Sequence, residues 1–273
     1  MTSFRTACRG DLRWGAKRQR SMKLLRFSSA DKTSFGILEG DVVREISGSP
    51  FGPFDATADG CPLDEVMLLA PVEPSKVIGV GLNYIDHAKE LKMAIPQNPI
   101  LFMKPPTSVI GPGDAIVYPK MSEQVDYEAE LVVVIKDKTK DVSVEEAASH
   151  ILGYTCGNDV TARDLQRKDG QWTRSKSFDT FSPLGPWIET DLDPLDVQVE
   201  MLLNGNVVQS SSTSNMIFNV FELVSFVSQI MTLLPGDVIM TGTPPGVGPV
   251  QPGDTTEVRI QGIGTLTNQV VSS

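Results

Sequence analysis

The stretch VDYEAELVVVI, residues 125–135, places two carboxylates directly before a run of five apolar residues. Leu131 to Ile135 are rich in Val and Ile, whose side chains suit a packed β-strand. Because side chains at i and i+2 of a strand point to the same face, Glu128 and Glu130 share one side. Like charges this close repel one another. The pattern therefore indicates either a cation between the two carboxylates or a strand end that is exposed to solvent.

The composition is that of an ordinary globular protein, with 40% apolar and 21% charged residues among 273. This length allows one large domain, or one domain with a small appendage. No apolar run in the sequence approaches the roughly 20 residues that cross a bilayer. A net charge of −10 argues against nucleic acid or an anionic membrane as the main partner. The three cysteines fit no CxxC spacing, so we expect a reducing compartment and no thiolate metal site.

The first 21 residues are expected to lie outside the folded core. Eight basic residues but only one acidic residue, Asp11, precede residue 27. An Arg-rich leader poor in acid is typical of an organelle transit peptide. Alternatively, the start codon is assigned too early, and translation begins at Met22 with the sequence MKLLRF. We therefore expect a cytoplasmic location, with mitochondria as the alternative if the leader is a transit peptide.

Residues 22–72 are predicted to form a small N-terminal α/β domain and residues 73–273 the main domain. In the small domain, KLLRFS and SFGILEGDVVREI predict a meander of strands, and LDEVMLLA at 63–70 predicts a short helix. In the main domain, short strands outnumber helices, and the Asn-Gly pair at 204–205 predicts a type I′ hairpin turn. The predicted class is α+β and rich in β-strands, rather than a doubly wound sheet.

A third carboxylate is predicted to complete the pair on the strand. Asp159, in GYTCGNDVTARD, lies where an apolar strand gives way to a turn, a position suited to facing a cavity. With Glu128 and Glu130 it supplies three carboxylates from two strands. Ligation by oxygen alone suits Mg²⁺ or Mn²⁺ better than zinc. The structural alternative is that Asp159 caps the following helix, with Thr161 as a rival cap.

Several further side chains could take part in chemistry. His87 precedes Glu90 by three positions, so the two share a helix face, and a carboxylate there makes an imidazole a better general base. The alternative is an ordinary surface pair. Lys176 lies in a polar loop, where it would neutralise an anionic substrate or simply be solvated. Thr243 lies in the Gly/Pro-rich loop MTGTPPGVGP, whose glycines allow close backbone approach. His150 is assigned no role.

Other common catalytic motifs are missing from the sequence. Neither GxxxxGK[ST] nor a helix-opening GxGxxG is present, so nucleotide binding has no support. No GxSxG elbow is present, which leaves serine hydrolase chemistry equally unsupported.

Eight motifs in order carry a family resemblance over residues 76 to about 265. They are GLNYIDHAKE, FMKPPTSVIGPGD, VDYEAEL, GYTCGNDVTARDLQ, KSFDTFSPLGP, NGNVVQ, MIF and LLPGDVIMTGTPPGVGP. Each alone is a weak signal, but the ordered set resembles the fumarylacetoacetate hydrolase family. KSFDTFSPLGP is similar to the branch with bacterial oxaloacetate decarboxylases, acylpyruvases, hydroxymuconate isomerases and the animal domain-containing-2 proteins.

The resemblance implies a mixed β-roll catalytic domain, a homodimer, and Mg²⁺ or Mn²⁺ bound by Glu128, Glu130 and Asp159. It also implies that His87 and Glu90 activate a water molecule on a segment that orders over the substrate.

The same resemblance implies roles for five further residues. Lys176 would lie near the substrate's charge, and Gln166 and Thr243 would contact the substrate. Asn83 and Arg163 belong to the motifs and are expected to have structural roles first. The fourth acid found near the metal of fumarylacetoacetase has no counterpart around residues 80–83, which argues against that specific activity.

The predicted function is a metal-dependent C–C hydrolase or decarboxylase acting on a small 2-oxo acid through a metal-stabilised enolate. The substrate would be an acylpyruvate or oxaloacetate. The alternative is an isomerase or tautomerase of a 2-hydroxymuconate-type diacid or of oxaloacetate, because the same enolate serves both reactions. A third possibility is a catalytically idle family member that binds or supports a partner.

Overall fold

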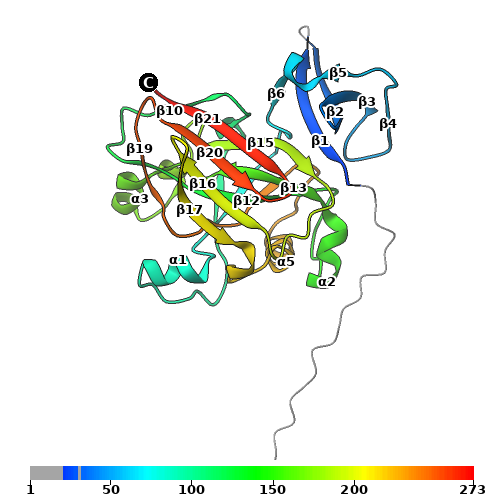
Figure 1. Ribbon diagram of the computed structural model, residues 1–273. Helices are drawn as coiled ribbons and strands as arrows, with labels where there is room; N and C mark the ends of the chain where they lie inside the picture. The colour runs from blue at the N-terminus through cyan, green and yellow to red at the C-terminus, as the bar shows by residue number, and fades with distance from the viewer. Residues whose placement is uncertain (1–20, 30–31) are drawn as a thin grey trace, which may run out of the picture.

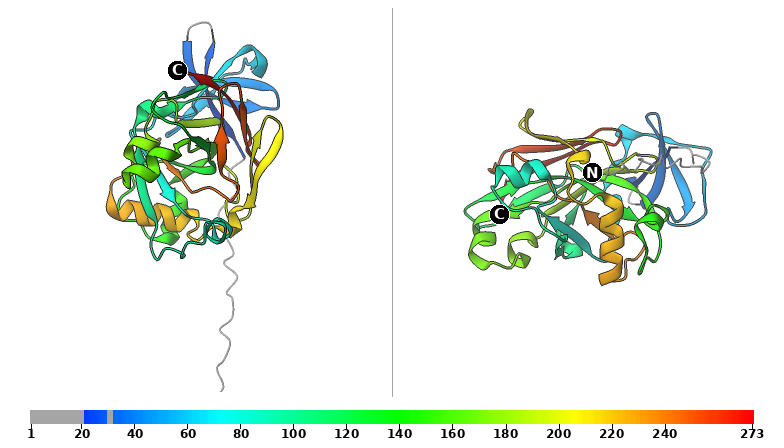
Figure 2. Two further views of the ribbon diagram at one scale, coloured as in Figure 1. Left: turned by 90° about the vertical axis from the view of Figure 1, so that its left-hand side faces the viewer. Right: turned by 90° about the horizontal axis from the view of Figure 1, so that it is seen from below.

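The structure is a computed structural model that describes residues 21–29 and 32–273. All but the last residue of the predicted leader lies outside the described residues. A small domain of blue and cyan strands lies to one side of a larger, strand-rich body (Figure 1, Figure 2). The predicted α+β class, rich in β-strands, is confirmed.

The strands of residues 21–29 and 32–273 form three sheets. The main path of the long sheet runs β4 (Phe54–Ala56), β3 (Val42–Gly48), β2 (Lys32–Glu39), β1 (Lys23–Ser29), β15 (Ser182–Glu189), β13 (Ile151–Asn158), β12 (Ala129–Ile135), β18 (Val238–Met240), β7 (Val77–Gly81) and β8 (Ile100–Lys104). Three short strands pair beside this path: β5 (Cys61–Pro62), β6 (Met67–Leu69) and β9 (Val109–Ile110). The second sheet runs β10 (Ala115–Tyr118), β21 (Gly264–Ser272), β20 (Thr255–Ile260), β16 (Gln198–Leu203) and β17 (Asn206–Ser212). The third runs β14 (Thr161–Ala162), β11 (Val125–Tyr127) and β19 (Gly248–Val250).

The helices are short apart from the last one. The α-helices are α1 (Ile85–Glu90), α2 (Val144–Ala147), α3 (Arg163–Asp169), α4 (Thr173–Lys176) and α5 (Val220–Ile230). Single 3₁₀ turns span Leu63–Glu65, Pro106–Ser108, Ala148–His150 and Thr213–Asn215. Within the described part of the chain, no helix has the length and apolar character that crossing a bilayer demands.

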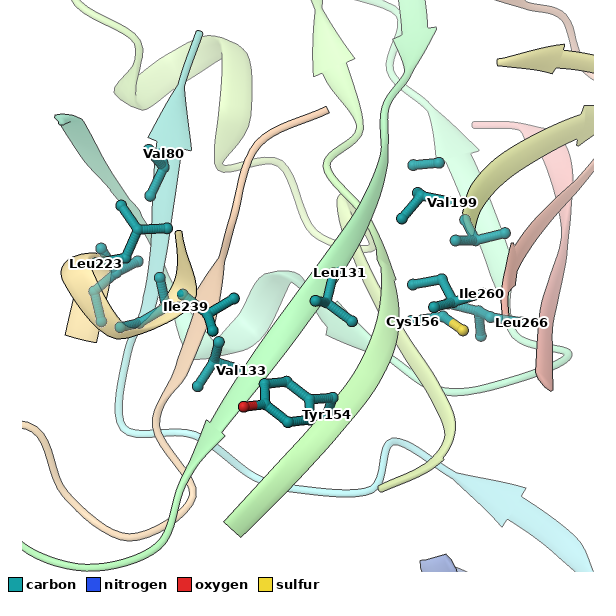
Figure 3. Packing of buried hydrophobic residues seen from close by; sticks show 14 of the residues in the cluster. Val80, Leu131, Val133, Tyr154, Cys156, Val199, Leu223, Ile239, Ile260 and Leu266 are labelled. Atoms are coloured by element: carbon teal, nitrogen blue, oxygen red, sulfur yellow. The ribbon is translucent and has the colours of Figure 1, made fainter. Parts of the chain in front are cut away.

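Strand β12 is apolar from Leu131 to Ile135 because both of its faces are covered. Leu131 and Val133 point into the larger core cluster, whereas Val132 and Val134 point into a second cluster on the opposite face. Figure 3 shows Leu131 and Val133 beside Tyr154 of the neighbouring strand β13. This double burial explains why the sequence reads as a continuous apolar run rather than an alternating one.

The small domain is built from strands β1 to β6 and has its own core around Leu25, Phe27 and Val43. Its strand β1 also pairs with β15, which joins the domain to the long sheet. The helix predicted over residues 63–70 is wrong: a single 3₁₀ turn is followed by strand β6, whose residues pair with β1. That pairing with a neighbouring strand overrides the local helical pattern. The proposed domain boundary at residues 72 and 73 falls between β6 and β7.

The predicted hairpin at 204–205 is confirmed. Asn204 has φ of 52° and Gly205 has φ of 78°. A type I′ turn requires positive φ at both central residues, and this turn joins β16 to β17. Strand β16 also packs against β12.

Candidate active site

Three carboxylates meet where strands β12 and β13 pair. Glu128 precedes β12, Glu130 lies on it, and Asp159 directly follows β13. The backbone amide of Asp159 donates to the carbonyl of Glu128 at 2.9 Å, which fixes the two chain segments together. One carboxylate oxygen from each residue lies within 4.8 Å of the other two, and all three side chains are buried. The solvent-exposed alternative for this strand end is therefore excluded.

Two buried lysines hold Asp159 from either side. Lys104 Nζ lies 2.6 Å from Oδ1, and Lys176 Nζ lies 2.5 Å from Oδ2. Lys176 also lies 2.8 Å from Glu128 Oε2. Burial lowers the pKa of Lys104, whereas for Lys176 the charges of Asp159 and Glu128 outweigh burial and raise the pKa. Lys176 is therefore not a solvated loop lysine but part of a buried charge network.

Arg163, the first residue of α3, holds Glu128 in place. Its Nη2 donates to Glu128 Oε1, its Nε donates to Asp126 at 2.8 Å, and its Nη1 donates to Gln166 at 2.7 Å. The residue was expected to be structural first, and these contacts give it that role. It also lines the cavity over the carboxylates, so it lies at the site itself.

The two glutamates have opposite pKa shifts although they are two residues apart. Burial raises the pKa of Glu128, but Lys176 and Arg163 outweigh it and lower the pKa to about 2. For Glu130, burial and then the charges of Asp159 and Glu128 raise the pKa well above its usual value. The amide of Gly242 donates to Glu130 Oε2 at 2.8 Å and offsets only part of this repulsion. Glu130 is thus the carboxyl whose charged form is least favourable in this cluster, and a divalent cation beside it would favour that form.

His87 and Glu90 share one face of α1, as their spacing predicts. His87 Nδ1 lies 2.8 Å from Glu90 Oε2. The amide of Gly246 donates to Glu90 Oε1 at 3.2 Å, which anchors the pair against the Gly/Pro-rich loop. His87 is buried and lines the cavity, so the pair differs from an ordinary surface contact.

Gln166 and Thr243 both line the same cavity. The hydroxyl of Thr243 donates to the carbonyl of Ala129 at 2.9 Å and accepts from Gln209 Nε2 at 2.9 Å. The side-chain oxygen of Gln166 accepts a hydrogen bond from Arg163, which in turn contacts Glu128. The structure thus brings both predicted contact residues to the rim of the carboxylate cluster.

The helix-cap alternative for Asp159 is wrong. Helix α3 begins after Ala162, and no side chain caps it. The hydroxyl of Thr161 donates instead to the carbonyl of Asp159 at 2.9 Å. The carboxylate of Asp159 is left free to face the two lysines.

The cavity above the carboxylates has a volume of about 180 Å³. Pockets for drug-sized ligands usually measure about 300–1,000 Å³, so this one suits a small substrate. Sequence reasoning missed three of the residues that build the site: Lys104, Phe102 and Trp172. Lys104 could have been found, because a lysine within the apolar strand ILFMK is buried only if it is paired. The rings of Phe102 and Trp172 gave no local signal.

Residues 76–271 match the family described as "Fumarylacetoacetate (FAA) hydrolase C-terminal". The chain belongs to this family. Residues 22–71 match a second family, described as "Rv2993c-like, N-terminal".

Named relatives of this family member differ in their reactions. A crystal structure of 5-carboxymethyl-2-hydroxymuconate delta-isomerase from Mycobacterium smegmatis is 51% identical, with a TM-score of 0.88, and covers 92% of this chain and 100% of its own. Human oxaloacetate tautomerase FAHD2B, mitochondrial, is 46% identical over 77% of this chain and 71% of its own length. Maleylpyruvate hydrolase from Sphingobium sp. SYK-6, solved with manganese(II) and pyruvate, is 28% identical with a TM-score of 0.78, and covers 92% of this chain and 100% of its own.

Proposed function

We propose that the protein is a divalent-metal-dependent enzyme that forms the enolate of a small 2-oxo acid. The observation that carries this proposal is the cluster of Glu128, Glu130 and Asp159, three buried carboxylates with oxygens within 4.8 Å of one another at the base of a cavity. These three would hold Mg²⁺ or Mn²⁺, hard cations that prefer oxygen ligands.

The raised pKa of Glu130 supports a cation at this place. Three acids so close together are unfavourable without positive charge, and of these three acids only Glu128 and Asp159 form ion pairs with the lysines. The manganese(II) and pyruvate of the Sphingobium relative are a metal and a 2-oxo acid of the proposed kind. When bound, the ion would supply a Lewis acid for negative charge that develops on the keto oxygen of the substrate.

The protein side chains position the ligands and move the proton. Lys104 and Arg163 fix the orientation of Asp159 and Glu128. His87 is the base: its Nδ1 contacts Glu90, which leaves Nε2 to take a proton. The Gly246 amide keeps Glu90 in this orientation.

The first candidate reaction is cleavage of a C–C bond. In acylpyruvate hydrolysis, His87 takes a proton from water, the water oxygen bonds to the acyl carbon, and the bond to the pyruvate methylene breaks. Its electron pair stays on the pyruvate enolate, which then takes a proton to give pyruvate. Decarboxylation of oxaloacetate forms the same enolate without needing the base. The pairing of His87 with Glu90 at the cavity favours the hydrolytic version.

The second candidate is an isomerase or tautomerase, in which a proton moves and no C–C bond breaks. The names of two relatives, an isomerase at 51% identity and a tautomerase at 46%, favour it. Removal of a proton next to the keto group gives the enolate, and its return at another atom completes the reaction.

Proton NMR in D₂O with Mg²⁺ separates these candidates. The panel is oxaloacetate, acetylpyruvate and a 2-hydroxymuconate-type diacid, each with the wild type and the Asp159→Asn variant. New acetate and pyruvate signals identify a hydrolase, whereas proton exchange or a double-bond shift without cleavage identifies an isomerase. Asp159→Asn is expected to abolish either reaction and Mn²⁺ binding. Equal turnover by wild type and variant, or no change in any compound, would defeat the proposal.

Assembly and location remain proposals as well. We propose a homodimer, which sedimentation at micromolar concentration would test. A cytoplasmic location is proposed, with mitochondria as the alternative suggested by the basic leader and by the name of the human relative. Fluorescent fusions with and without residues 1–21 would separate the two locations.

A further inference from the structure

Two glycines of strand β7 make room for two aromatic rings. Gly79 and Gly81 lie two residues apart and so share a face of the strand. A Cβ atom on Gly79 would come within 2.2 Å of the ring of Phe102, and one on Gly81 within 2.6 Å of the ring of Trp172. Phe102 is also the cross-strand partner of Gly79. The sequence GVG therefore allows both rings to lie directly against the strand.

The two rings form one continuous wall that begins at the charged site. Phe102 and Trp172 pack edge to face, with ring centroids 5.4 Å apart. Lys176 Nζ lies 4.9 Å from the Phe102 centroid. Lys176 and Trp172 are four residues apart, and the amide of Lys176 donates to the carbonyl of Trp172 at 3.1 Å. A single helical turn thus joins Trp172, which contacts the aromatic ring of Phe102, to Lys176, which contacts the carboxylates.

Three further apolar side chains belong to the cavity lining. Leu91, Met93 and Ile100 also line the cavity, and Ile100 lies next to Trp172, because a Cβ atom on Gly81 would meet both side chains. The three side chains of the cavity lining that can carry positive charge already contact carboxylates: His87 contacts Glu90, while Arg163 and Lys176 contact Glu128. No other lysine, arginine or histidine among the described residues lines this cavity, so none is left to pair with a second negative charge of a ligand.

We propose that Trp172 is a specificity-determining residue that selects 2-oxo acids with an uncharged, apolar tail. The 2-oxo acid end would lie over the carboxylates, and the tail would lie against Trp172 and Phe102. This inference rests on the proposed function, since it assumes that a 2-oxo acid is what binds. It goes further in choosing among substrates: a short aliphatic acyl or alkyl tail is favoured over a terminal carboxylate.

Binding of ligands that need not react tests the inference directly. Calorimetry with Mg²⁺ would measure pyruvate, 2-oxobutyrate, 2-oxopentanoate and 2-oxohexanoate against the wild type. We expect affinity to rise about fourfold per methylene, the equivalent of about 0.8 kcal/mol. A matched pair of ligands isolates the effect of a charge on the tail. The ligands 5-methyl-2-oxohexanoate and 2-oxoglutarate share one heavy-atom skeleton, but the first ends in two methyl groups and the second in a carboxylate. The neutral ligand should bind at least tenfold more tightly.

Variants then locate the effect. Trp172→Ala should remove most of the gain from longer tails but leave pyruvate affinity within about twofold. Trp172→Phe should keep part of the gain in affinity that Trp172→Ala loses. Gly81→Ala, whose new Cβ would displace the Trp172 ring, should resemble Trp172→Ala. Trp187→Phe is the control for loss of a tryptophan, because Trp187 bonds the carbonyl of Ile263 away from the cavity. Unchanged Mg²⁺ affinity in each variant shows that the metal site is intact.

The outcomes separate this inference from the proposed function. Equal affinity for the matched pair in the wild type, or an equal loss for short and long ligands in Trp172→Ala, would overturn the role of Trp172. If tail-dependent binding is found but no 2-oxo acid reacts, the inference stands and the proposed function fails. If no 2-oxo acid binds at all, both fail.

Discussion

The ammonium group of Lys104 lies 2.6 Å from Oδ1 of Asp159, and both side chains are fully shielded from solvent. Lys104 also donates to the carbonyl of Phe181, so its position is fixed from two sides. Because Asp159 is a proposed metal ligand, Lys104 would orient a metal ligand without binding the metal itself.

Lys104→Met should therefore reduce both stability and metal affinity. Removing one partner of a buried ion pair costs about 3–5 kcal/mol of unfolding free energy when the other charge is left unpaired. Lys176 still contacts Asp159 in this variant, so we expect a loss at or below the lower end of that range. Loss of a residue that orients a ligand should weaken Mn²⁺ binding about 10- to 100-fold. Urea unfolding and Mn²⁺ titration followed by electron paramagnetic resonance would measure these two effects.

Lys76→Met is the matched control for Lys104→Met. Lys76 pairs with the buried Asp237 outside the described site, so this variant should lose stability while Mn²⁺ affinity stays the same. Wild-type Mn²⁺ affinity in Lys104→Met would contradict the orienting role.

Glu128 should contribute stability that disappears in acid. Its folded-state pKa of about 2 lies below the usual 4.5, so the contribution is fully present above pH 4.5 and is lost as the pH falls towards 2. In metal-free protein, Glu128→Gln should therefore be less stable than wild type at pH 6, with a difference that shrinks by pH 3. Urea unfolding at both values checks this, with the exposed Glu73→Gln as control. An equal difference in unfolding free energy at pH 6 and pH 3 would show that the ion pairs of Glu128 do not stabilise the fold.

His87→Gln should slow acylpyruvate hydrolysis about 10²- to 10⁴-fold, the usual range for loss of a general base. Mn²⁺ affinity should not change, since His87 contacts Glu90 rather than the carboxylate cluster. Oxaloacetate decarboxylation, which requires no activated water, should fall much less. Lys89→Gln on the exposed side of α1 is the control. Hydrolysis at the wild-type rate would remove His87 from the mechanism.

Asn83→Ala should reduce stability more than loss of an exposed asparagine. The buried side-chain amide of Asn83 donates to the carbonyls of Phe218 and Thr241 and accepts from the amide of Phe218. Each buried polar group left unpaired costs about 1–3 kcal/mol, so a loss of roughly 3 kcal/mol or more is expected in chemical unfolding. Asn206→Ala, in the exposed hairpin, should cost far less. Similar losses in both variants would contradict the structural role of Asn83.

The sequence predicts those parts of the site that depend on local spacing. The i, i+2 relation of Glu128 and Glu130 and the i, i+3 relation of His87 and Glu90 follow from strand and helix geometry alone. Bringing Asp159 beside the glutamates requires the register of β12 against β13, which local pattern does not give. Residue type and the strand-end position grouped the three acids as a hypothesis, and the family resemblance supported that grouping, but the register itself comes from the structure.

Other parts depend on contacts between distant segments and were missed. Lys104 reaches Asp159 across 55 residues, and the ring of Trp172 reaches Gly81 from a separate helix. The helix predicted at 63–70 failed for the same reason, because pairing with β1 decides that segment. Local propensity is a weak guide wherever a distant strand supplies the hydrogen bonds.

The positive groups around the acids have a consequence for how the protein matures. Lys104, Lys176 and Arg163 already balance much of the negative charge of the cluster. If an ion binds as proposed, we therefore expect newly made chains to reach the native state before it arrives, unlike small zinc domains that stay unfolded without theirs. The proposed ion could then be loaded late, withdrawn or exchanged as the cellular metal supply changes, while the fold stays intact.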